Sequence, residues 1–324
     1  MAKIIAMGNA LVDIMTMLED DKTLDSLILP KGSMQLVDSL TSKNIQELTS
    51  HLPKSLASGG SAANTIRSLA MLGISTGYLG KIGDDEMGTF FSEDMKKTGV
   101  FTRLIKTTTP TGVAVALLSK NSERTFATIL GAAAELTPDD ITDLTFAEYD
   151  ILHVEGYLLF NHELIEKALS TAKQNGLKIS LDLASYNVVE ANLEFLKYLV
   201  EKYVDILFAN EEEAKAFTGK EPEAALTMIS TICEIAVVKV GSEGSYVKKG
   251  NLIHKEGVIK VNPIDSTGAG DYYAAGFLHG LVKNWPLDKC ARAGAILSGN
   301  VIEVIGATMD EIRWKNILLE IEKL

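Results

Sequence analysis

The chain has 324 residues, of which 46% are hydrophobic and 23% charged, and this balance is ordinary for a water-soluble globular protein with a large core. Its 31 Lys and Arg residues against 43 Asp and Glu residues give a formal net charge of −12, which argues against nucleic acid or an anionic membrane as the main partner. Any phosphate-binding site must therefore rest on backbone amides, metal ions and a few local cations.

The cysteines and the apolar runs indicate a cytoplasmic protein. Cys233 and Cys290 have neither a disulfide framework nor metal-ligand spacing, so we expect reduced thiols. The first apolar run, Ile4–Met7, is too short for a signal peptide, and no stretch approaches the ~18 apolar residues of a membrane span.

Short runs rich in β-branched residues alternate with helical patterns along the chain. The predicted strands are Ile4–Met7, Ile151–Val154, Ile179–Leu181, Ile206–Phe208 and Ile235–Val240, and the predicted helices between them include Glu163–Gln174 and Glu211–Thr218. This alternation predicts right-handed βαβ units and hence an α/β fold with a doubly wound, mainly parallel sheet. In such sheets ligands bind at the carboxyl ends of the strands.

Two segments, 12–38 and 101–130, have a different pattern. They contain alternating sequences such as Gly112–Leu118, separated by polar turns. We expect these segments to form a small antiparallel β lid on a single α/β domain that spans residues 1–324.

Asn9 and Asp13 follow the first predicted strand. The carboxylate of Asp13 has two oxygens and could accept hydrogen bonds from two vicinal hydroxyls of a substrate. A plain turn accounts for the same residues, because Asn and Asp are common in turns.

A pair of glycines, Gly59 and Gly60, precedes a predicted helix over Thr65–Leu72. The N-terminus of this helix could hydrogen-bond substrate hydroxyls through its free backbone N–H groups and through Asn64. An ordinary helix start accounts for the segment equally well.

Asn210 follows another predicted strand, and Glu213 lies three residues later. This is the spacing of a capping box, which explains the segment without any function. The alternative is that the two residues hold Mg²⁺ or its water ligands near nucleotide phosphates, because Mg²⁺ takes few carboxylates and many waters.

The segment Asp265–Asp271 carries the strongest functional signal. Three small residues, Gly268, Ala269 and Gly270, lie where a helix begins, because apolar residues with helical spacing follow them. A helix N-terminus offers unpaired N–H groups, and small residues let a phosphate approach them closely. Asp271 is then placed to take the proton of a hydroxyl during phosphoryl transfer. The alternative is an N-capped helix after a tight turn.

Several other functional signals are absent from the sequence. There is no Walker-type G-x-x-x-x-G-K-[ST] loop, no Rossmann fingerprint after the first strand and no G-x-S-x-G motif. The five histidines are scattered without ligand spacing, so we interpret them as structural.

In their order and spacing the motifs resemble those of the ribokinase-like (PfkB) family of ATP-dependent sugar and nucleoside kinases. The resemblance covers essentially the whole chain. Gly59–Asn64 is similar to the first signature of the family, Asn210–Glu213 to its Asn-x-x-Glu motif, and Asp265–Asp271 to its second signature, with Ser266 in place of a threonine.

This resemblance implies a doubly wound α/β core with a small β lid, and it implies ATP and Mg²⁺ as the phosphoryl donor and the metal. It assigns Asp271 as the general base, the backbone of 268–270 as the anion hole and Glu213 as a Mg²⁺ contact through water. The loop on the nucleotide side of the family corresponds to Gly241, Ser242 and Gly244.

Within the family the chain is most similar to the bacterial adenosine kinase-like branch. The segments that carry this similarity are Gly8–Ile14, Lys31–Met34, Leu130–Ala132, Glu155–Tyr157 and Phe208–Glu211. By this resemblance Asn9 and Asp13 would bind the ribose hydroxyls, with Gly60 and Asn64 beside them. Leu11 would lie on one face of the adenine, and Tyr157 or Leu158 on the other.

Further positions are assigned by the same resemblance. Arg124 occupies a lid position that helps to close the site, and Gly294 stands near the ATP adenine, where many members of the family carry a polar residue. A monovalent cation such as K⁺ beside the anion hole would be held by Asp265, Thr267, Val301 and Gly306.

We therefore expect an ATP-dependent kinase that phosphorylates the 5′-hydroxyl of a ribonucleoside, with adenosine as the first candidate. The alternative within the enzyme class is a sugar kinase that acts on ribose, fructose or a similar sugar. The alternative from another class is a sensor that only binds nucleoside, and the presence of Asp271 argues against it. Both a monomer and a homodimer are compatible with the sequence.

Overall fold

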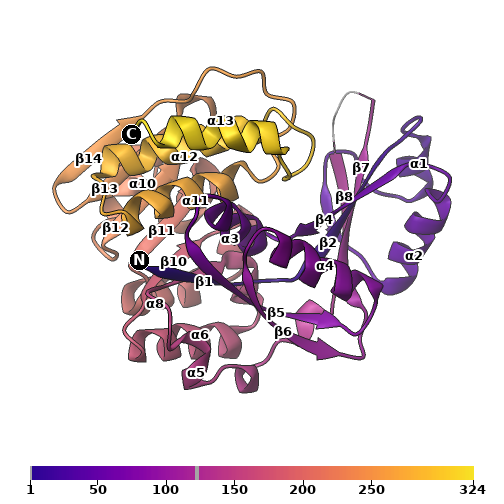
Figure 1. Ribbon diagram of the computed structural model, residues 1–324, viewed down its shortest axis with the longest axis horizontal. Helices are drawn as coiled ribbons and strands as arrows, with labels where there is room; N and C mark the ends of the chain where they lie inside the picture. The colour runs from indigo at the N-terminus through magenta and orange to yellow at the C-terminus, as the bar shows by residue number, and fades with distance from the viewer. Residues whose placement is uncertain (1, 121–123) are drawn as a thin grey trace.

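The computed structural model describes residues 2–120 and 124–324, and a nine-stranded sheet forms the centre of its larger part (Figure 1). The order of the strands is β14-β13-β12-β11-β10-β9-β1-β5-β6, and the seven from β12 to β6 are parallel. We call these nine strands the large sheet. In chain order they are β1 (Lys3–Met7), β5 (Ser75–Gly83), β6 (Phe101–Thr107), β9 (Ile151–Glu155), β10 (Lys178–Asp182), β11 (Ile206–Asn210), β12 (Ile235–Lys239), β13 (Ser245–Lys249) and β14 (Leu252–Glu256).

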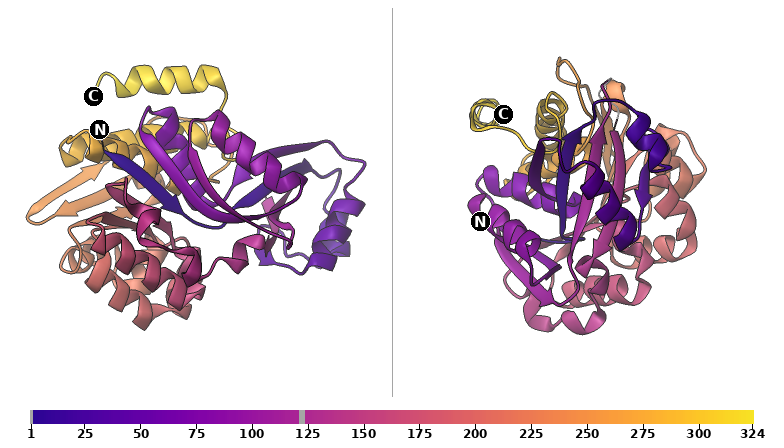
Figure 2. Two further views of the ribbon diagram at one scale, coloured as in Figure 1. Left: turned by 60° about the horizontal axis from the view of Figure 1, so that its bottom comes forward. Right: turned by 90° about the vertical axis from the view of Figure 1, so that its right-hand side faces the viewer.

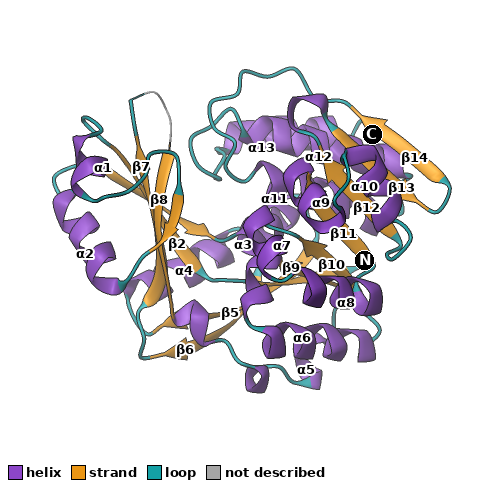
Figure 3. Cartoon of the chain, turned by 180° about the vertical axis from the view of Figure 1, so that it is seen from behind, coloured by secondary structure: helices purple, strands orange, loops and turns teal. Residues whose placement is uncertain are grey.

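Helices cover both faces of the large sheet (Figure 3). Alternate side chains of a strand point to opposite faces, so Ile4 and Ala6 of β1 join one hydrophobic cluster while Ile5 and Met7 join the other. The first face carries α3 (Ser61–Met71), α4 (Glu86–Lys97), α11 (Ala269–Val282), α12 (Leu287–Val301) and α13 (Glu311–Ile321). The second carries α5 (Asp143–Phe146), α6 (His162–Gln174), α7 (Tyr186–Ala191), α8 (Leu193–Tyr203), α9 (Glu211–Thr218) and α10 (Pro222–Ile229).

A second sheet, which we call the small sheet, stands to one side of the large one (Figure 2). Its strand order is β3-β8-β7-β2-β4, and two helices, α1 (Lys22–Ser26) and α2 (Ser39–Leu48), lie beside it. The strands are β2 (Leu11–Met17), β3 (Met34–Leu36), β4 (Lys54–Gly59), β7 (Thr111–Leu118) and β8 (Arg124–Gly131). Four short 3₁₀ helices complete the described elements: η1 (Ala132–Glu135), η2 (Pro138–Asp140), η3 (Gly156–Phe160) and η4 (Gly241–Glu243).

The predicted α/β class, with a doubly wound parallel sheet and a separate small sheet, is confirmed. The composition of the small sheet differs in detail from the expectation. Residues 101–107 form β6 and pair with β5 at the edge of the large sheet, where partial exposure gives them the mixed polar pattern of a lid strand. Residues 121–123, inside the predicted lid segment, lie outside the described residues.

The small sheet differs from the predicted antiparallel lid in two further ways. It contains a strand, β4, that the sequence pattern does not indicate, and the sheet includes both parallel and antiparallel pairs. β4 is made of the small and polar residues Lys54–Gly59, which carry a weak strand signal. β2 pairs with β4 in the antiparallel sense and with β7 in the parallel sense. None of the helices in 2–120 and 124–324 has the length and apolar character required to cross a membrane.

Candidate active site

Polar side chains gather at the carboxyl-terminal edge of the large sheet, where parallel strands end together. Asn9 follows β1, and four neighbouring strands end in Glu155, Asp182, Asn210 and Lys239. Because the strand runs before these residues are almost wholly buried, the change to polar chemistry marks the ligand-binding edge of the sheet.

Asp271 lies in the first turn of α11 and is held by the first turn of α3. Ser61 Oγ donates to Asp271 Oδ1 at 2.6 Å, and Asn64 Nδ2 donates to Asp271 Oδ2 at 2.9 Å. Thr65 Oγ1 donates to the backbone oxygen of Asp271 at 3.1 Å. Burial raises the pKa of Asp271 to about 7, although the hydrogen bonds from Ser61 and Asn64 lower it. The carboxylate is thus oriented by hydrogen bonds and partly buried, and its pKa lies near neutral pH.

The backbone before Asp271 presents free amides. Gly268 adopts a left-handed conformation (φ 76°) at the N-cap of α11, which favours glycine. The amide of Ala269 donates to the Ser266 oxygen at 3.1 Å, whereas the amides of Gly268, Gly270 and Asp271 form no hydrogen bond within the described part of the chain. Of the three amides predicted for the anion hole, two are therefore available to an anion.

The N-terminus of α3 begins at Ser61, four residues before the predicted start. Gly60 forms its N-cap with φ 100°, and a Cβ atom at this residue would overlap the backbone oxygen of Asn9. The apolar spacing starts only after Asn64, so periodicity alone cannot locate the first turn. The earlier start places Asn64 inside the helix, with its side chain on Asp271.

Glu155 is a functional candidate that the sequence reasoning did not single out. Its Oε1 accepts hydrogen bonds from Asn9 N at 2.9 Å and Asn9 Nδ2 at 2.7 Å, and its Oε2 accepts from Ala62 N at 2.9 Å. The side chain is buried, which raises its pKa despite these bonds. Glu155 thus ties the loop after β1 to the start of α3, and its signal in the sequence is an acid at the end of a buried strand.

Asp13 lies in β2 of the small sheet, opposite Ala57 of β4. A Cβ atom at Gly59 would overlap the Asp13 carboxylate, so the glycine leaves room for the acid. Burial raises the pKa of Asp13 to about 6, against the opposing charges of Arg67 and Arg124. The carboxylate is therefore close in space to the glycine pair, as the ribose-binding prediction requires.

Arg67 of α3 is a buried guanidinium that connects several segments around the site. It donates to the backbone oxygen and the Oγ of Ser58, to Asp94 Oδ2 and to the Ala307 oxygen, at 2.8–3.3 Å. It also donates to Asn64 Oδ1 at 3.3 Å, which fixes the amide so that its nitrogen faces Asp271.

Arg124 links the small sheet to the loop before α11. Its guanidinium forms an ion pair with Asp265 and donates a hydrogen bond to Thr267 Oγ1. Asp265 also accepts from Thr267 N at 2.9 Å and from Gly306 N at 2.6 Å, while Val301, at the end of α12, is buried.

Within the described residues no group of three or more His, Cys, Asp or Glu side chains is arranged to hold a metal ion.

Leu11 and Tyr157 come from different elements. Leu11 begins β2, is almost buried, and its methyl group occupies the space that a Cβ atom at Gly112 would need. Tyr157 lies half-buried in η3, and burial together with the charges of Glu155 and Asp271 raises its pKa.

Asn210 and Glu213 form the capping box at the start of α9. Asn210 Oδ1 accepts from Glu213 N at 2.8 Å, and the Glu213 carboxylate accepts from Asn210 N at 2.7 Å and Asn210 Nδ2 at 2.8 Å. Burial, and then the charge of Asp182, raise the pKa of Glu213 to about 7. Both carboxylate oxygens already accept bonds from Asn210, so a water-mediated metal contact fits better than direct ligation.

The predicted nucleotide-side loop forms η4 after β12. Gly241 and Gly244 have φ values of 52° and 95°, and Gly241 and Ser242 line a pocket of about 840 Å³ with residues of α9 and α10. Gly294 instead lies buried in α12, where a Cβ atom would meet the backbone oxygen and the ring of Tyr273. The structure thus gives Gly294 a role in the close packing of α11 on α12.

Asp182 and Lys239 form an ion pair that the sequence reasoning missed, with Lys239 Nζ 2.9 Å from Asp182 Oδ2. The two residues are 57 positions apart, and β11 lies between their strands in the sheet. The available signal is that each is the polar residue at the end of a buried strand.

Residues 46–313 match the profile of the pfkB family of carbohydrate kinases, so the chain belongs to this family of phosphotransferases. A probable sugar kinase from Rhizobium etli CFN 42 has a similar structure, with a TM-score of 0.88, 30% identity and coverage of 98% of both chains. Adenosine kinase from Sinorhizobium meliloti has a TM-score of 0.87 and 32% identity, and the match covers 98% of this chain and 99% of that one. The 5-dehydro-2-deoxygluconokinase of Geobacillus kaustophilus is 28% identical over 264 residues, which is 75% of this chain and 78% of that protein.

Proposed function

We propose that this kinase transfers the γ-phosphoryl group of ATP to the 5′-hydroxyl of a ribonucleoside, with adenosine as the first candidate. The observation that carries the proposal is Asp271, which is fixed by Ser61 and Asn64 beside the free amides of Gly268 and Gly270. A base next to an anion-binding helix start is the arrangement that phosphoryl transfer to an alcohol needs.

In the proposed reaction Asp271 accepts the proton of the 5′-hydroxyl while the hydroxyl oxygen attacks the γ-phosphorus. The oxygen–phosphorus bond forms as the bond to the ADP oxygen breaks. The amides of Gly268 and Gly270 donate to the phosphoryl oxygens and stabilise their charge. A pKa of about 7 lets Asp271 accept this proton near neutral pH.

We assign Mg²⁺ to the phosphate side, where Glu213 would hold it through water. Bound there, Mg²⁺ would supply positive charge that offsets the charge of the phosphates. A monovalent cation at Asp265 would share that carboxylate with Arg124, Thr267 and Gly306.

The nucleoside is assigned to the space between the two sheets. The partly buried carboxylate of Asp13 beside Gly59 offers two oxygens to vicinal ribose hydroxyls, and Asn9 lies at the same junction. Leu11 and Tyr157 would contact the base. The similarity to the Sinorhizobium meliloti adenosine kinase, over nearly the whole chain, supports this choice of acceptor.

A sugar acceptor is the second candidate. The 5-dehydro-2-deoxygluconokinases, at 27–29% identity, and the probable sugar kinase of Rhizobium etli favour it. In this alternative Asp13 and Asn9 would bind the hydroxyls of the sugar, and no base would occupy the space near Tyr157.

One experiment separates these candidates. ADP release from MgATP is measured with adenosine, guanosine, cytidine, ribose, fructose and 5-dehydro-2-deoxygluconate as acceptors. We expect adenosine to give the highest kcat/KM, with adenosine 5′-monophosphate as the product. A higher kcat/KM for a sugar would replace the nucleoside assignment, and binding of adenosine without any turnover would favour the sensor.

A further inference from the structure

Lys239 lies against the backbone of the anion hole. A Cβ atom placed on Gly270 would be only 3.0 Å from Lys239 Nζ, so the ammonium group packs closely against the backbone of residue 270. Gly270 thus leaves room for this cation as well as for the approach of a phosphate. This contact brings the end of β12 to the first turn of α11.

The ammonium group has donors to spare. Its hydrogen bond within the described part of the chain goes to Asp182 Oδ2, whereas an ammonium carries three N–H donors. The Lys239 side chain is 15% exposed and that of Asp182 only 7%, so the lysine is the more accessible member of the pair. A purely structural buried pair would satisfy more of these donors, because unpaired buried donors are costly.

The surroundings of Lys239 are otherwise acidic. Asp182, Glu213 and Asp271 all act on its charge and raise its pKa, against the effect of burial. Three carboxylates at the place where ATP phosphates must come would repel them strongly. The other two buried cations near the site are committed elsewhere, Arg67 to Ser58 and Ala307, and Arg124 to Asp265.

We propose that Lys239 is a catalytic residue that binds the phosphoryl group being transferred, and that Asp182 positions it. This inference rests on the proposed function, because it assigns a further residue to the same phosphoryl transfer. The acceptor oxygen–phosphorus bond forms, the bond to the ADP oxygen breaks, and the acceptor proton moves to Asp271. Lys239 keeps all three of its protons and donates hydrogen bonds to phosphoryl oxygens, together with the amides of Gly268 and Gly270.

The main test is the affinity of the full-length variants for the non-hydrolysable analogue AMP-PNP with Mg²⁺, measured by calorimetry without any acceptor. Lys239→Met keeps the length of the side chain but removes its charge. We expect AMP-PNP affinity to fall about 10- to 100-fold, which is the range for a lost charge-assisted hydrogen bond. Adenosine affinity should change by less than about threefold, because the ammonium faces the phosphate side.

Two companion variants separate phosphate binding from a structural role. Asp182→Asn keeps the ammonium and should retain AMP-PNP affinity within about threefold, while its kcat falls because the lysine is less well placed. The double variant Asp182→Asn with Lys239→Met is neutral and avoids an unpaired buried carboxylate, so it remains testable where the single lysine variant unfolds. If the folded double variant binds AMP-PNP as the wild type does, Lys239 is only a structural ion-pair partner.

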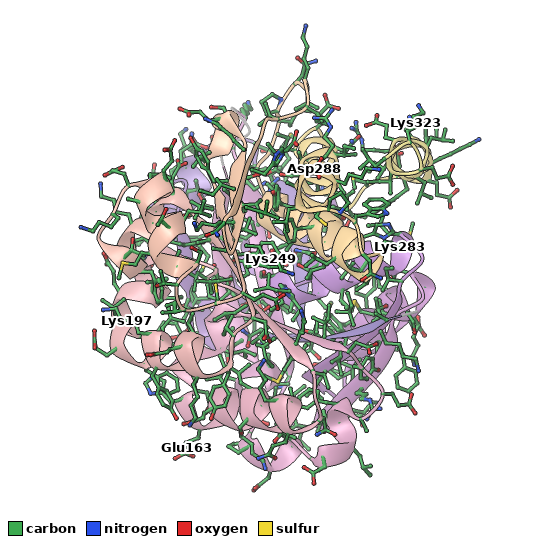
Figure 4. The ribbon with its side chains drawn as sticks, turned by 90° about the vertical axis from the view of Figure 1, so that its left-hand side faces the viewer. Glu163, Lys197, Lys249, Lys283, Asp288 and Lys323 are labelled. Atoms are coloured by element: carbon green, nitrogen blue, oxygen red, sulfur yellow. The ribbon has the colours of Figure 1, made fainter. Side chains whose placement is uncertain are left out.

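Lys249→Met is the matched control. Lys249 pairs with Glu234 on the side of the molecule away from the small sheet, where Figure 4 labels it. This substitution has the same chemistry and should leave AMP-PNP affinity unchanged. A loss as large as that of Lys239→Met would assign the effect to general charge and overturn the proposal.

A measurement on the unchanged protein complements the variants. Saturating AMP-PNP should slow the acetylation of Lys239 by acetic anhydride several-fold and leave Lys249 unaffected, and equal rates with and without AMP-PNP would contradict the proposal. Neither this assay nor the calorimetry needs an acceptor. If the wild type phosphorylates none of the acceptors, the proposed function fails, while the role of Lys239 toward phosphate is still decided.

Discussion

The large sheet and the small sheet supply groups to the candidate site in different ways. At the ends of the large-sheet strands each polar group has fixed partners, as Glu155 accepts three hydrogen bonds and Lys239 pairs with Asp182. The strands behind them are buried on both faces. This part of the site is thus built on a rigid framework.

The small sheet is buried less completely. Met34, Leu36 and Leu56 are exposed on its strands, and its link to the loop before α11 runs through Arg124. Ser58 of β4 is also hydrogen-bonded to Arg67 and Asp94, but apolar side chains that are exposed on these strands add little packing to hold the sheet in one position. The comparison indicates that the large sheet carries the chemistry, whereas the small sheet brings Asp13 and Arg124 to it as a proposed lid.

The largest expected effect is a loss of turnover when the proposed base, Asp271, is replaced. Asp271→Asn keeps the shape of the side chain but removes its ability to accept a proton, and loss of a general base costs about 10²–10⁴-fold in rate. We expect kcat to fall by this factor while the Kd of adenosine changes only a few-fold. Steady-state kinetics and calorimetry measure the two quantities. Turnover near that of the wild type would refute the assignment of Asp271 as base.

The pH dependence provides a second test of the same residue. Because the pKa of Asp271 is about 7, kcat/KM should fall about tenfold per pH unit below that value, as the base becomes protonated. Between about pH 4 and 7 the folded protein holds a proton that an unfolded aspartate has lost, so this group lowers the free energy of unfolding as pH rises through that window. Asp271→Asn should remove the dependence of kcat/KM and weaken that of the free energy of unfolding, to which Glu213 and Asp13 also contribute, as pH–rate profiles and urea unfolding would show. A profile that stays flat from pH 5 to 8 would argue against a base with this pKa.

Asp13 tests the contribution of the small sheet. If it accepts the ribose hydroxyls, 2′-deoxyadenosine leaves a carboxylate that the bound ligand encloses partly unpaired, at a cost of roughly 1–3 kcal/mol. We therefore expect kcat/KM for 2′-deoxyadenosine to be clearly below that for adenosine, and Asp13→Ala to remove the difference. Equal values for the two nucleosides in the wild type would reduce Asp13 to a structural residue of β2.

The two sheets also differ in how well the sequence predicts them. Five strands of the large sheet, β1 and β9 to β12, are apolar runs that the pattern predicts, whereas β5, β6, β13 and β14 are more polar or glycine-rich and were not predicted as its strands. The capping box at Asn210 and Glu213 locates the start of α9 at Glu211. The strand β4 and the first turn of α3 carry no such periodicity, so the pattern misses them.

Two of the missed groups of the site depend on sheet order. Asp182 and Lys239 meet across β11, a contact that no local spacing encodes. Ser61 and Glu155 were missed because a single hydroxyl or acid at an element boundary has an ordinary capping explanation. Asp271, Asn64 and the glycines could be predicted as site residues because their motifs are compact and their chemistry is local.

The smallest expected effect concerns the proposed lid. Adenosine should slow amide exchange a few-fold in β2, β7 and β8 of the small sheet, because closure excludes water from the site. β6, which pairs with β5 in the large sheet, should not share this protection although it lies next to β7 in the sequence. Ribose should protect less than adenosine, since it leaves the space near Leu11 and Tyr157 unfilled.

Arg124→Gln sharpens this last prediction, because it removes the ion pair to Asp265 without shortening the side chain by much. We expect the protection by adenosine to decrease in the small sheet and to remain unchanged in β1 and β9. Hydrogen exchange followed by mass spectrometry resolves these segments. Equal protection of β6 and β7 would mean that the two sheets respond as one body, and protection by ribose as strong as that by adenosine would favour a sugar as the acceptor.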